Sequence, residues 1–368
     1  MITTKERVFL ELCRFLDPDV DYIKKNIRSV PQAELLGMIQ LNRMSGVVYK
    51  TMSENNLLKY VDREFRNVLE ASYETNILKN RVFYDSVRSL VEGLGTVNQK
   101  YAMLKGAILC GLYPEGMRTS NDIDLLVSEK DITEIGDNLK QCGFEQGYII
   151  NGNIEKANRR DVIEARLTRG ETVPFVRRNA NSLFKFTEVD MNFSVDYKAS
   201  AGTEVEEIIS HSGVWNIGGI RIPAPSKVDF FIHLCFHLYK ELTTFPWIKM
   251  GRDMTLYKFC DIYMVLNNRL TGTVSELFDR AYKLKCERIV SCVILWTNEL
   301  LPIQDQEMIS RAKEIEINDP EDLYNTVYDP ENKRVLKYVY RDICDRFFRN
   351  NRESLLAVKR YETYKNDD

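Results

Sequence analysis

The 368-residue sequence has only three histidines, no two cysteines in a CxxC spacing and a net charge of only −3. Few histidines and no paired cysteines leave little basis for a zinc site. With so little net charge there is no overall basic field, so any contact with nucleic acid must be local. The longest apolar run, residues 289–296, is interrupted by Ser291 and is far too short to span a bilayer.

The composition indicates an ordinary soluble globular protein. The eight cysteines are scattered, mostly within apolar helical patterns, which predicts reduced, buried thiols in the cytoplasm rather than a disulfide framework. Residues 1–16 are amphipathic and charged, without the long apolar core and cleavage site of an export signal. The length, with 44% hydrophobic and 29% charged residues, predicts two or three domains and no membrane partner.

The most informative stretch is residues 101–127, where two strand-like runs, 101–104 and 122–127, bracket a glycine-started helical turn and a polar loop. The second run opens with Asp122 and Asp124. Because alternate residues of a strand share a face, both carboxylates point the same way. Two neighbouring carboxylates repel each other, and a divalent cation removes that conflict. These hard oxygen ligands predict a site for Mg²⁺ or Mn²⁺.

A third carboxylate is available further along the chain. A two-metal site usually takes an acidic residue from a neighbouring strand as well. The run of residues 184–195 alternates apolar and polar positions and contains Glu188 and Asp190. Asp190 lies mid-strand with apolar neighbours on both sides, so we expect it to be the third ligand, with Glu188 as the alternative.

The dipeptide Lys105-Gly106 and the run 118–127 resemble the K-G…R-x-S-x-D-I-D-L-L-V signature of uncharacterised bacterial nucleotidyltransferases in the DNA polymerase beta superfamily. The superfamily pattern is a glycine followed by Gly or Ser, a short helix, Asp-hydrophobic-Asp/Glu, and an acidic residue on a later strand. Four residues occupy the Gly and acidic positions here: Gly106, Asp122, Asp124 and Asp190. The sequence departs from the pattern at Ala107, where many members carry Ser or Gly, and at Asn192, where relatives often carry His.

The resemblance implies an enzyme that moves a nucleoside monophosphate from an NTP to an acceptor hydroxyl and releases pyrophosphate. It implies an α+β fold, with a small mixed β-sheet core flanked by N-terminal and C-terminal helical regions. The catalytic and metal-binding residues would be Asp122, Asp124 and Asp190. The nucleotide would be bound at five positions: Lys105, Gly106, Ala107, Arg118 and Ser120. In this arrangement the phosphates lie over the helix N-terminus at Gly106, where free N–H groups favour anions.

The acceptor is left open between an RNA 3′ end, a protein hydroxyl and a small molecule. Some relatives resemble the toxins of bacterial toxin–antitoxin or phage-defence systems, which would add an antitoxin as a protein partner. The alternative from another class is a catalytically silent nucleotide-binding or regulatory module with the same fold, which Ala107 and Asn192 favour. A metal-dependent phosphatase is disfavoured because the additional His and Asp ligands of such sites are missing.

Periodicity divides the chain into an N-terminal helical region (1–97), a nucleotidyltransferase core (98–222) and a C-terminal helical domain (223–368). The first helix should stop at Asp17-Pro18, because proline disfavours a helical residue before it. Residues 61–91 predict one or two long helices.

Within the core, Ser128 is expected to cap a helix that ends at Gly143, followed by a strand from 144 to 150. The Arg-rich segment 156–178 either grips phosphates or forms a solvated hairpin.

In the C-terminal domain, Ser226 is expected to cap a helix that carries His233 and His237 one turn apart. Position 234 is leucine and the only other histidine is His211, so we expect core or hydrogen-bonded histidines rather than zinc ligands. Lys258 or Asp261 either faces the nucleotide or forms a structural salt bridge. After a turn at 329–330, a last helix should run through residue 347, and the tail 359–368 should be frayed.

Overall fold

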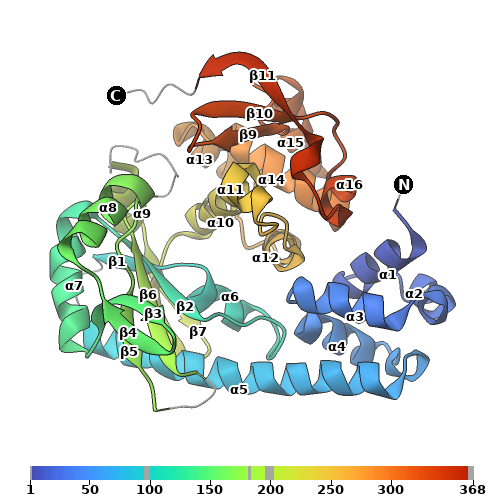
Figure 1. Ribbon diagram of the computed structural model, residues 1–368, viewed down its shortest axis with the longest axis horizontal. Coiled ribbons are helices and arrows are strands. Elements are labelled where there is room, and N and C mark those ends of the chain that lie inside the picture. Colours follow the sequence, from blue (N-terminus) through green and yellow to red (C-terminus); the bar gives the residue numbers. More distant parts are fainter. Residues whose placement is uncertain (1, 95–99, 181–183, 195–202, 364–368) are drawn as a thin grey trace. The chain divides into compact units, whose positions relative to one another are not determined.

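The computed structural model describes residues 2–94, 100–180, 184–194 and 203–363 (Figure 1). Its contacts divide the chain into two compact units: Glu70–Phe230, and Met1–Leu69 together with Phe231–Asp368. Each unit combines helices with a β-sheet, so the protein is α+β, as the sequence predicts. The expected boundary at 97/98 falls outside the described residues, and the division into three segments stays a prediction.

The Glu70–Phe230 unit is built on a mixed six-stranded sheet in the order β1-β2-β6-β5-β3-β4. The central pair β2 and β6 is parallel, and the other neighbours are antiparallel. The strands of this sheet are β1 (Tyr101–Met103), β2 (Asp122–Val127), β3 (Glu145–Ile150), β4 (Asn153–Lys156), β5 (Phe175–Arg178) and β6 (Phe186–Asn192). A separate hairpin is made by β7 (Gly213–Ile217) and β8 (Ile220–Ala224), and β8 contacts β1.

One face of the sheet is covered by two of this unit's helices, α7 and the second half of α5. The helices of this unit are α6 (Gly106–Leu112), α7 (Ile132–Gln141), α8 (Arg159–Arg169), α9 (Thr203–Ser210) and the second half of α5 (Arg63–Leu94). Gly136 of α7 approaches the Phe175 ring so closely that an added Cβ would lie 3.2 Å from it. Ser86 of α5 and Thr187 of β6 are joined by a buried hydrogen bond of 3.0 Å. Both contacts involve the strand face that carries Val189 and Met191, so the carboxylates project from the other face.

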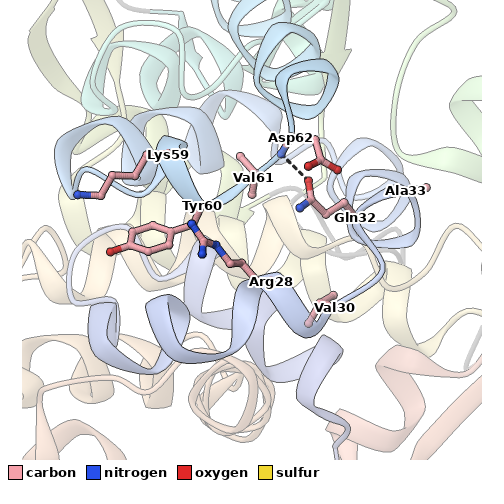
Figure 2. Close-up of a pocket in the computed structure, with 8 residues that line it drawn as sticks. All are labelled: Arg28, Val30, Gln32, Ala33, Lys59, Tyr60, Val61 and Asp62. Atoms are coloured by element: carbon pink, nitrogen blue, oxygen red, sulfur yellow. Dashed lines mark hydrogen bonds between the residues drawn. The ribbon is translucent and has the colours of Figure 1, made fainter.

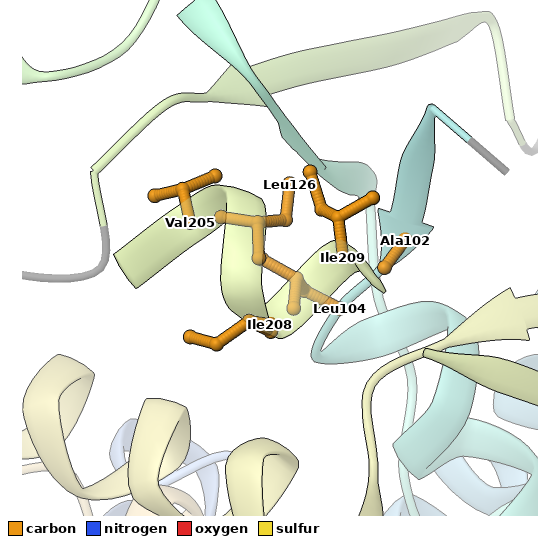
Figure 3. Packing of buried hydrophobic residues seen from close by; sticks show 6 residues of the cluster. All are labelled: Ala102, Leu104, Leu126, Val205, Ile208 and Ile209. Carbon is orange, nitrogen blue, oxygen red and sulfur yellow. The ribbon is translucent and has the colours of Figure 1, made fainter. Parts of the chain in front are cut away.

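Helix α9 packs on the carboxylate-bearing face of β2, beyond the carboxylates (Figure 3). Its apolar side chains join those of β1 and β2 in a buried cluster of Ala102, Leu104, Leu126, Val205, Ile208 and Ile209. Leu126 shares a face with Asp122 and Asp124, because it follows them at steps of two. Burying one Leu or Ile side chain stabilises a fold by about 1.5–3 kcal/mol, so this cluster fixes the strand beside the carboxylates.

The other unit is mainly helical. Its helices are α1 (Thr4–Cys13), α2 (Val20–Asn26), α3 (Gln32–Leu41), α4 (Ser45–Glu54), the start of α5, α10 (Lys227–Thr243), α11 (Phe245–Lys249), α12 (Leu256–Asn267), α13 (Val274–Lys283), α14 (Glu287–Leu300), α15 (Gln306–Ile317) and α16 (Ile343–Phe348). It also contains an antiparallel sheet of β9 (Thr326–Asp329), β10 (Arg334–Tyr338) and β11 (Leu356–Thr363), in the order β11-β10-β9.

This three-stranded sheet was not predicted, and it replaces most of the last helix expected from the sequence. The expected helix through residue 347 is instead a β9–β10 hairpin followed by the short helix α16. Asp329 closes the hairpin turn, since its carboxylate accepts hydrogen bonds from Asn332 and from Arg334 (2.7 Å to Nε). Residues 359–363 of the expected frayed tail belong to β11, and 364–368 lie outside the described residues.

Helix boundaries were predicted with mixed success. Helix α5 is one continuous helix, which is one of the two arrangements expected for residues 61–91. Ser226 caps α10 as predicted, since its Oγ accepts a hydrogen bond of 3.1 Å from the Asp229 N–H. The first helix ends at Cys13, before the predicted stop. Ser128 caps no helix: its hydroxyl donates to Glu206 of α9 at 3.0 Å, and α7 begins only at Ile132, after a 3₁₀ turn.

The eight cysteines are all free thiols, six of them buried, which confirms that they form no disulfide framework. Within the described ranges, no helix combines the length and the apolar character that a membrane crossing requires.

Candidate active site

The sheet brings the predicted carboxylates together at the β2–β6 pair. In the parallel register, Asp122 is opposite Glu188 and Asp124 is opposite Asp190. Because alternate residues share a strand face, all four carboxylates project from the same side of the sheet. The structure therefore places both candidates for the third acidic residue, Asp190 and Glu188, beside the Asp122-Ile123-Asp124 motif.

These carboxylates are crowded, and Asp124 is buried while the other three are half-buried. Asp124 is only 4% exposed. Burial raises the pKa of Asp190 to about 8, and the charges of Asp124, Glu188, Asp122 and Glu171 add to the rise. Burial, followed by the charges of Asp122 and Asp124, also raises the pKa of Glu188. The site therefore carries more negative charge than its surroundings neutralise, and a cation would be stabilised there.

Lys105 supplies one positive charge. Its Nζ donates a hydrogen bond of 2.9 Å to Oδ1 of Asp124. Burial alone would lower the pKa of Lys105, but the charge and hydrogen bond of Asp124, with the charges of Asp122 and Asp190, raise it above its ordinary value. Asn192 Nδ2 donates to the same Asp124 oxygen at 3.4 Å. Asn192, one of the two residues that depart from the family pattern, thus helps to orient Asp124.

The turn that carries Lys105 is tightly built. Lys105 has φ +37° and ψ −110°, a backbone conformation that L-residues rarely adopt and that costs of order 1–3 kcal/mol. Gly106 follows it, and a Cβ added there would overlap Oγ and Cβ of Ser120. The Ser120 hydroxyl in turn donates to Asp122 Oδ1 at 2.9 Å. The Lys105-Gly106 turn and the loop before β2 are therefore locked against each other at the carboxylates.

The remaining predicted nucleotide contacts lie close to this turn in the chain. Ala107 is fully buried in the first turn of α6, where its N–H is among the donors without an intrahelical acceptor. With seven residues, α6 contributes only a small dipole. The Arg118 guanidinium donates to the Thr119 carbonyl, and the Arg118 carbonyl accepts from Asn80 Nδ2 at 2.9 Å. Arg118 is thus part of the loop framework, and its contact with a nucleotide stays a prediction.

The carboxylate oxygens are ligands of the type that a divalent cation prefers, but the side chains are not arranged to hold one in this structure. Among the described residues, no three His, Cys, Asp or Glu side chains lie in an arrangement that would hold a metal ion. At Asp124 the counter-charge is Lys105. The all-oxygen donor set and the raised pKa of Asp190 nonetheless fit Mg²⁺ or Mn²⁺. Metal binding by Asp122, Asp124 and Asp190 stays a prediction.

A comparison with protein-family models matches residues 28–302 to a family described as uncharacterised nucleotidyltransferases. The match covers well over half of the chain and includes the β2–β6 carboxylates. The chain belongs to this nucleotidyltransferase family. Membership indicates nucleotidyl transfer as the general function. A comparison with curated proteins found no match.

The Arg-rich segment 156–178 is not a simple hairpin, and some of its arginines are hydrogen-bonded within the fold. It spans the end of β4, helix α8 and strand β5. Arg177 donates to the Cys142 carbonyl at 3.1 Å, and Arg178 donates to the Gly152 carbonyl at 2.8 Å. These two arginines stabilise the fold. Arg159, Arg160 and Arg166 are exposed on α8, where a grip on phosphates stays a prediction, and the side chain of Arg169 lies outside the described residues.

In the other unit, Lys258 forms a buried ion pair with Glu241, and each side chain is 9% exposed. His237 Nε2 lies 3.5 Å from the other oxygen of Glu241. These contacts support the structural alternative for Lys258. The histidines fit the core or hydrogen-bonded role, since His233 is buried and His237 lies beside Glu241.

Sequence reasoning missed a surface pocket of about 640 Å³ in the N-terminal helices of the nucleotidyltransferase (Figure 2). Arg28 and Lys59 both lie near the Tyr60 ring, at 5.2 and 5.5 Å from its centroid. At the other end, the Asp62 N–H donates to Gln32 Oε1 at 2.8 Å. No motif marks these residues, because the pocket joins two segments about thirty residues apart, 28–33 and 59–62.

The sequence analysis also missed two residues beside the β2–β6 carboxylates. Glu171 adds to the negative charge around Asp190 and forms an isolated β-bridge with Asn192. Asn80 of α5 holds the loop before β2 through the Arg118 carbonyl. Only the pairing of distant segments reveals either role, so no local pattern could have identified them.

Proposed function

We propose that this protein transfers a nucleoside monophosphate from an NTP to an acceptor hydroxyl, with Asp122, Asp124 and Asp190 as its catalytic residues. The observation that carries the proposal is the register of β2 and β6, which sets the buried Asp124 beside the half-buried Asp190 on the same strand face. The match to the nucleotidyltransferase family is consistent with it. A member of the DNA polymerase beta superfamily would have this same carboxylate arrangement.

The donor nucleotide would be positioned by the turn and loop beside the carboxylates. The Lys105 ammonium, which is held at Asp124, provides the positive charge for the phosphates. Gly106 contributes a backbone N–H without an obstructing side chain, since a Cβ there would overlap Ser120, and Ala107 contributes a second backbone N–H. Ser120 holds Asp122 by a hydrogen bond and stands next to the phosphate path. Arg118 is the candidate for contact with the leaving pyrophosphate.

In the chemical step, the acceptor oxygen forms a bond to the α-phosphorus while the bond from that phosphorus to the bridging oxygen breaks. Pyrophosphate leaves with the electron pair of the broken bond. The acceptor hydroxyl gives up its proton as the new bond forms, and the Asp190 carboxylate is the candidate proton acceptor. Mg²⁺ or Mn²⁺, held by Asp122, Asp124 and Asp190, would neutralise the phosphate charge and make the acceptor hydroxyl more acidic.

A catalytically silent nucleotide-binding module is the second candidate. It is favoured by the Lys105–Asp124 pair, because a lysine that occupies a metal-ligand oxygen competes with a cation. In this alternative the nucleotide binds but no phosphoryl bond is broken.

Calorimetric titration with each non-hydrolysable NTP, with and without Mg²⁺, tests for the nucleotide site. Pyrophosphate release from the matching NTP, with RNA, protein and small-molecule hydroxyls as acceptors, tests for transfer. We expect Mg²⁺-dependent binding and pyrophosphate release in the wild type, and the loss of both in Asp122→Ala/Asp124→Ala. Asp137→Asn is the matched control, since it removes an exposed carboxylate of the same unit that pairs with Lys140.

The outcomes separate the two candidates. Binding without release of pyrophosphate for any acceptor would support the silent module. If no NTP binds, or if the double variant binds as well as the wild type, the carboxylates are not a nucleotide site and both candidates fail.

A further inference from the structure

The pocket in the N-terminal helices is formed entirely by residues 28–62 of the Met1–Leu69 segment (Figure 2). Its lining comes from the 3₁₀ turns Ile27–Ser29 and Leu58–Tyr60, the start of α3 and the residues just before α5. The volume of about 640 Å³ is within the range of small-molecule sites and about twenty times the share of liquid volume that one water takes. A ligand considerably larger than a single ion therefore fits this pocket.

One end of the pocket carries two positive charges beside an aromatic ring (Figure 2). The Arg28 guanidinium lies 5.2 Å and the Lys59 ammonium 5.5 Å from the centroid of the Tyr60 ring. Both cationic side chains are exposed, so they are presented to a ligand. Within the described ranges, neither has a carboxylate at ion-pair distance. Two like charges that are held beside one ring repel each other, and a bound anion removes that repulsion.

The two cations favour a phosphate over a carboxylate. A phosphate monoester carries a charge of about −1.5 to −2 at pH 7, which two cations balance, whereas a carboxylate carries only one negative charge. The planar guanidinium of Arg28 matches two phosphate oxygens at once, and the Lys59 ammonium adds a point charge on a flexible stem. This end of the pocket is therefore suited to a terminal phosphate group.

The other end of the pocket offers both a hydrogen-bond donor and an acceptor (Figure 2). Gln32 Oε1 accepts from the Asp62 backbone N–H at 2.8 Å, which holds the amide group and leaves its Nε2 as a donor. The Asp62 side chain is exposed, and in the described part of the chain its carboxylate forms no ion pair. A ligand group that suits this end both donates and accepts hydrogen bonds, as the edge of a nucleobase does.

The apolar residues of the lining contribute little to its surface. Val30 and Val61 are only 5% and 6% exposed, so the groups that a ligand meets are mainly polar or charged. An apolar ligand would bury little apolar area here, and its affinity would be correspondingly low. The pocket therefore favours a polar ligand with an anionic end.

We propose that this pocket binds a nucleotide, with its phosphate at Arg28 and Lys59 and the edge of its base at Gln32 and Asp62. The nucleotide is either free or the 5′-phosphorylated end of a single-stranded RNA, because both present a phosphate monoester and a base edge. The pocket needs no metal ion for this. The inference does not depend on the proposed nucleotidyl transfer, since none of the β2–β6 carboxylates lines the pocket.

Calorimetric titration of the full chain in EDTA with AMP, CMP, GMP and UMP, with their nucleosides and with inorganic phosphate, tests the proposal. We expect saturable one-to-one binding of at least one mononucleotide, at least about tenfold tighter than either its nucleoside or phosphate, because only the nucleotide contacts both ends. A 5′-phosphorylated oligoribonucleotide separates the two sources. Tighter binding than that of the mononucleotide assigns the pocket to an RNA end, and equal or weaker binding assigns it to a free nucleotide.

Substitutions at each end test the two contacts separately. Arg28→Met and Lys59→Met should each weaken mononucleotide binding about three- to tenfold, as expected for the loss of one charge-assisted contact. Asp62→Ala should weaken the binding of the mononucleotide but not of phosphate, while the Gln32 hydrogen bond persists because it uses the backbone N–H of residue 62. Lys25→Met is the matched control, since Lys25 is an exposed cation on α2 that does not line the pocket.

The double variant Asp122→Asn/Asp124→Asn should bind the mononucleotide as the wild type does, even if nucleotidyl transfer is absent altogether. Three results would overturn the proposal. One is that no mononucleotide binds more tightly than phosphate. Another is equal binding by the wild type and Arg28→Met/Lys59→Met. The third is loss of binding in Asp122→Asn/Asp124→Asn, which would assign the mononucleotide to the carboxylates instead. The substituted side chains of the pocket are exposed, and urea denaturation checks that each variant is folded.

Discussion

Lys105 donates a hydrogen bond of 2.9 Å to Oδ1 of Asp124, and this pair connects the strained turn before α6 to the middle of β2. The side chains are only 20% and 6% exposed, so their attraction is weakly screened by solvent. The lysine therefore has two effects. It neutralises one of four crowded carboxylates in the absence of metal, and it sets a positive charge where the proposed triphosphate would bind.

Replacing Lys105 by methionine should destabilise the metal-free protein by about 2–4 kcal/mol, because breaking a buried ion pair leaves a buried charge without its partner. Urea denaturation in the presence of EDTA measures this change. Lys140→Met is the control: Lys140 pairs with Asp137, both are 57% exposed, and such a pair contributes only about 0–1 kcal/mol. Equal effects of the two variants would show that the Lys105–Asp124 pair has no special importance for folding.

Gly106→Ala should weaken Mg²⁺-dependent NTP binding, because the new methyl group must displace Ser120 and with it the hydrogen bond to Asp122. We expect the affinity to fall at least about tenfold, as for the loss of one charge-assisted hydrogen bond. Calorimetry measures the affinity.

The double variant Gly106→Ala/Ser120→Gly should recover folding stability but not the affinity, since it removes both Ser120 atoms that the methyl group would overlap together with the hydroxyl that bonds Asp122. Gly213→Ala is a neutral control, because no atom lies within 4 Å of its added Cβ. Unchanged binding in Gly106→Ala would show that the turn and the loop are not coupled.

The three aspartates of the site could be predicted from the sequence, because they lie in motifs that also show the two-residue period of a strand. Asp122 and Asp124 share a face because the period of a strand is two, and a downstream strand with the same alternation contains Asp190. The sequence could not show that β2 and β6 are parallel neighbours in a register that pairs Asp124 with Asp190. Register depends on contacts between distant segments, which no local pattern contains.

The last part of the chain was predicted as a helix because the local sequence pattern does not show which segments pair as strands. Residues 326–338 follow a helical region, and only the pairing of β10 with β9 and β11 gives these short strands their stability. The Asp329 hydrogen bonds to Asn332 and Arg334 are likewise visible only in the folded chain.

The stability of the metal-free protein should decrease as the pH rises from about 4 to about 8. Asp190 ionises near pH 4 in an unfolded chain, but burial and the neighbouring carboxylates raise its pKa to about 8 in the folded protein. Between these values the unfolded state has lost a proton that the folded state retains, so each pH unit costs up to about 1.4 kcal/mol. Thermal unfolding in EDTA across this range measures the effect.

Asp190→Asn should flatten this pH dependence and raise the melting temperature most at pH 8, while Asp137→Asn should leave it unchanged. An equally steep profile for Asp190→Asn would assign the pH dependence to another group.

Mg²⁺ should raise the melting temperature more at pH 8 than at pH 5, because a cation binds the ionised carboxylates and not the protonated form of Asp190. Thermal unfolding with and without Mg²⁺ at the two pH values measures the difference. In Asp122→Asn/Asp124→Asn the difference should disappear. A stabilisation of equal size at both pH values, or one that persists in the double variant, would show that the ion binds elsewhere.

Lys258→Met should lower the free energy of unfolding by about 3–5 kcal/mol without changing NTP affinity, because Lys258 is the buried counter-charge of Glu241. Urea denaturation and calorimetry, performed on the same protein, measure the two quantities. Lys24→Met serves as control, since Lys24 pairs with Asp21 at the surface of the same unit and its loss should cost at most about 1 kcal/mol. A weaker NTP affinity with unchanged stability in Lys258→Met would instead make Lys258 a nucleotide contact, the alternative that its ion pair with Glu241 disfavours.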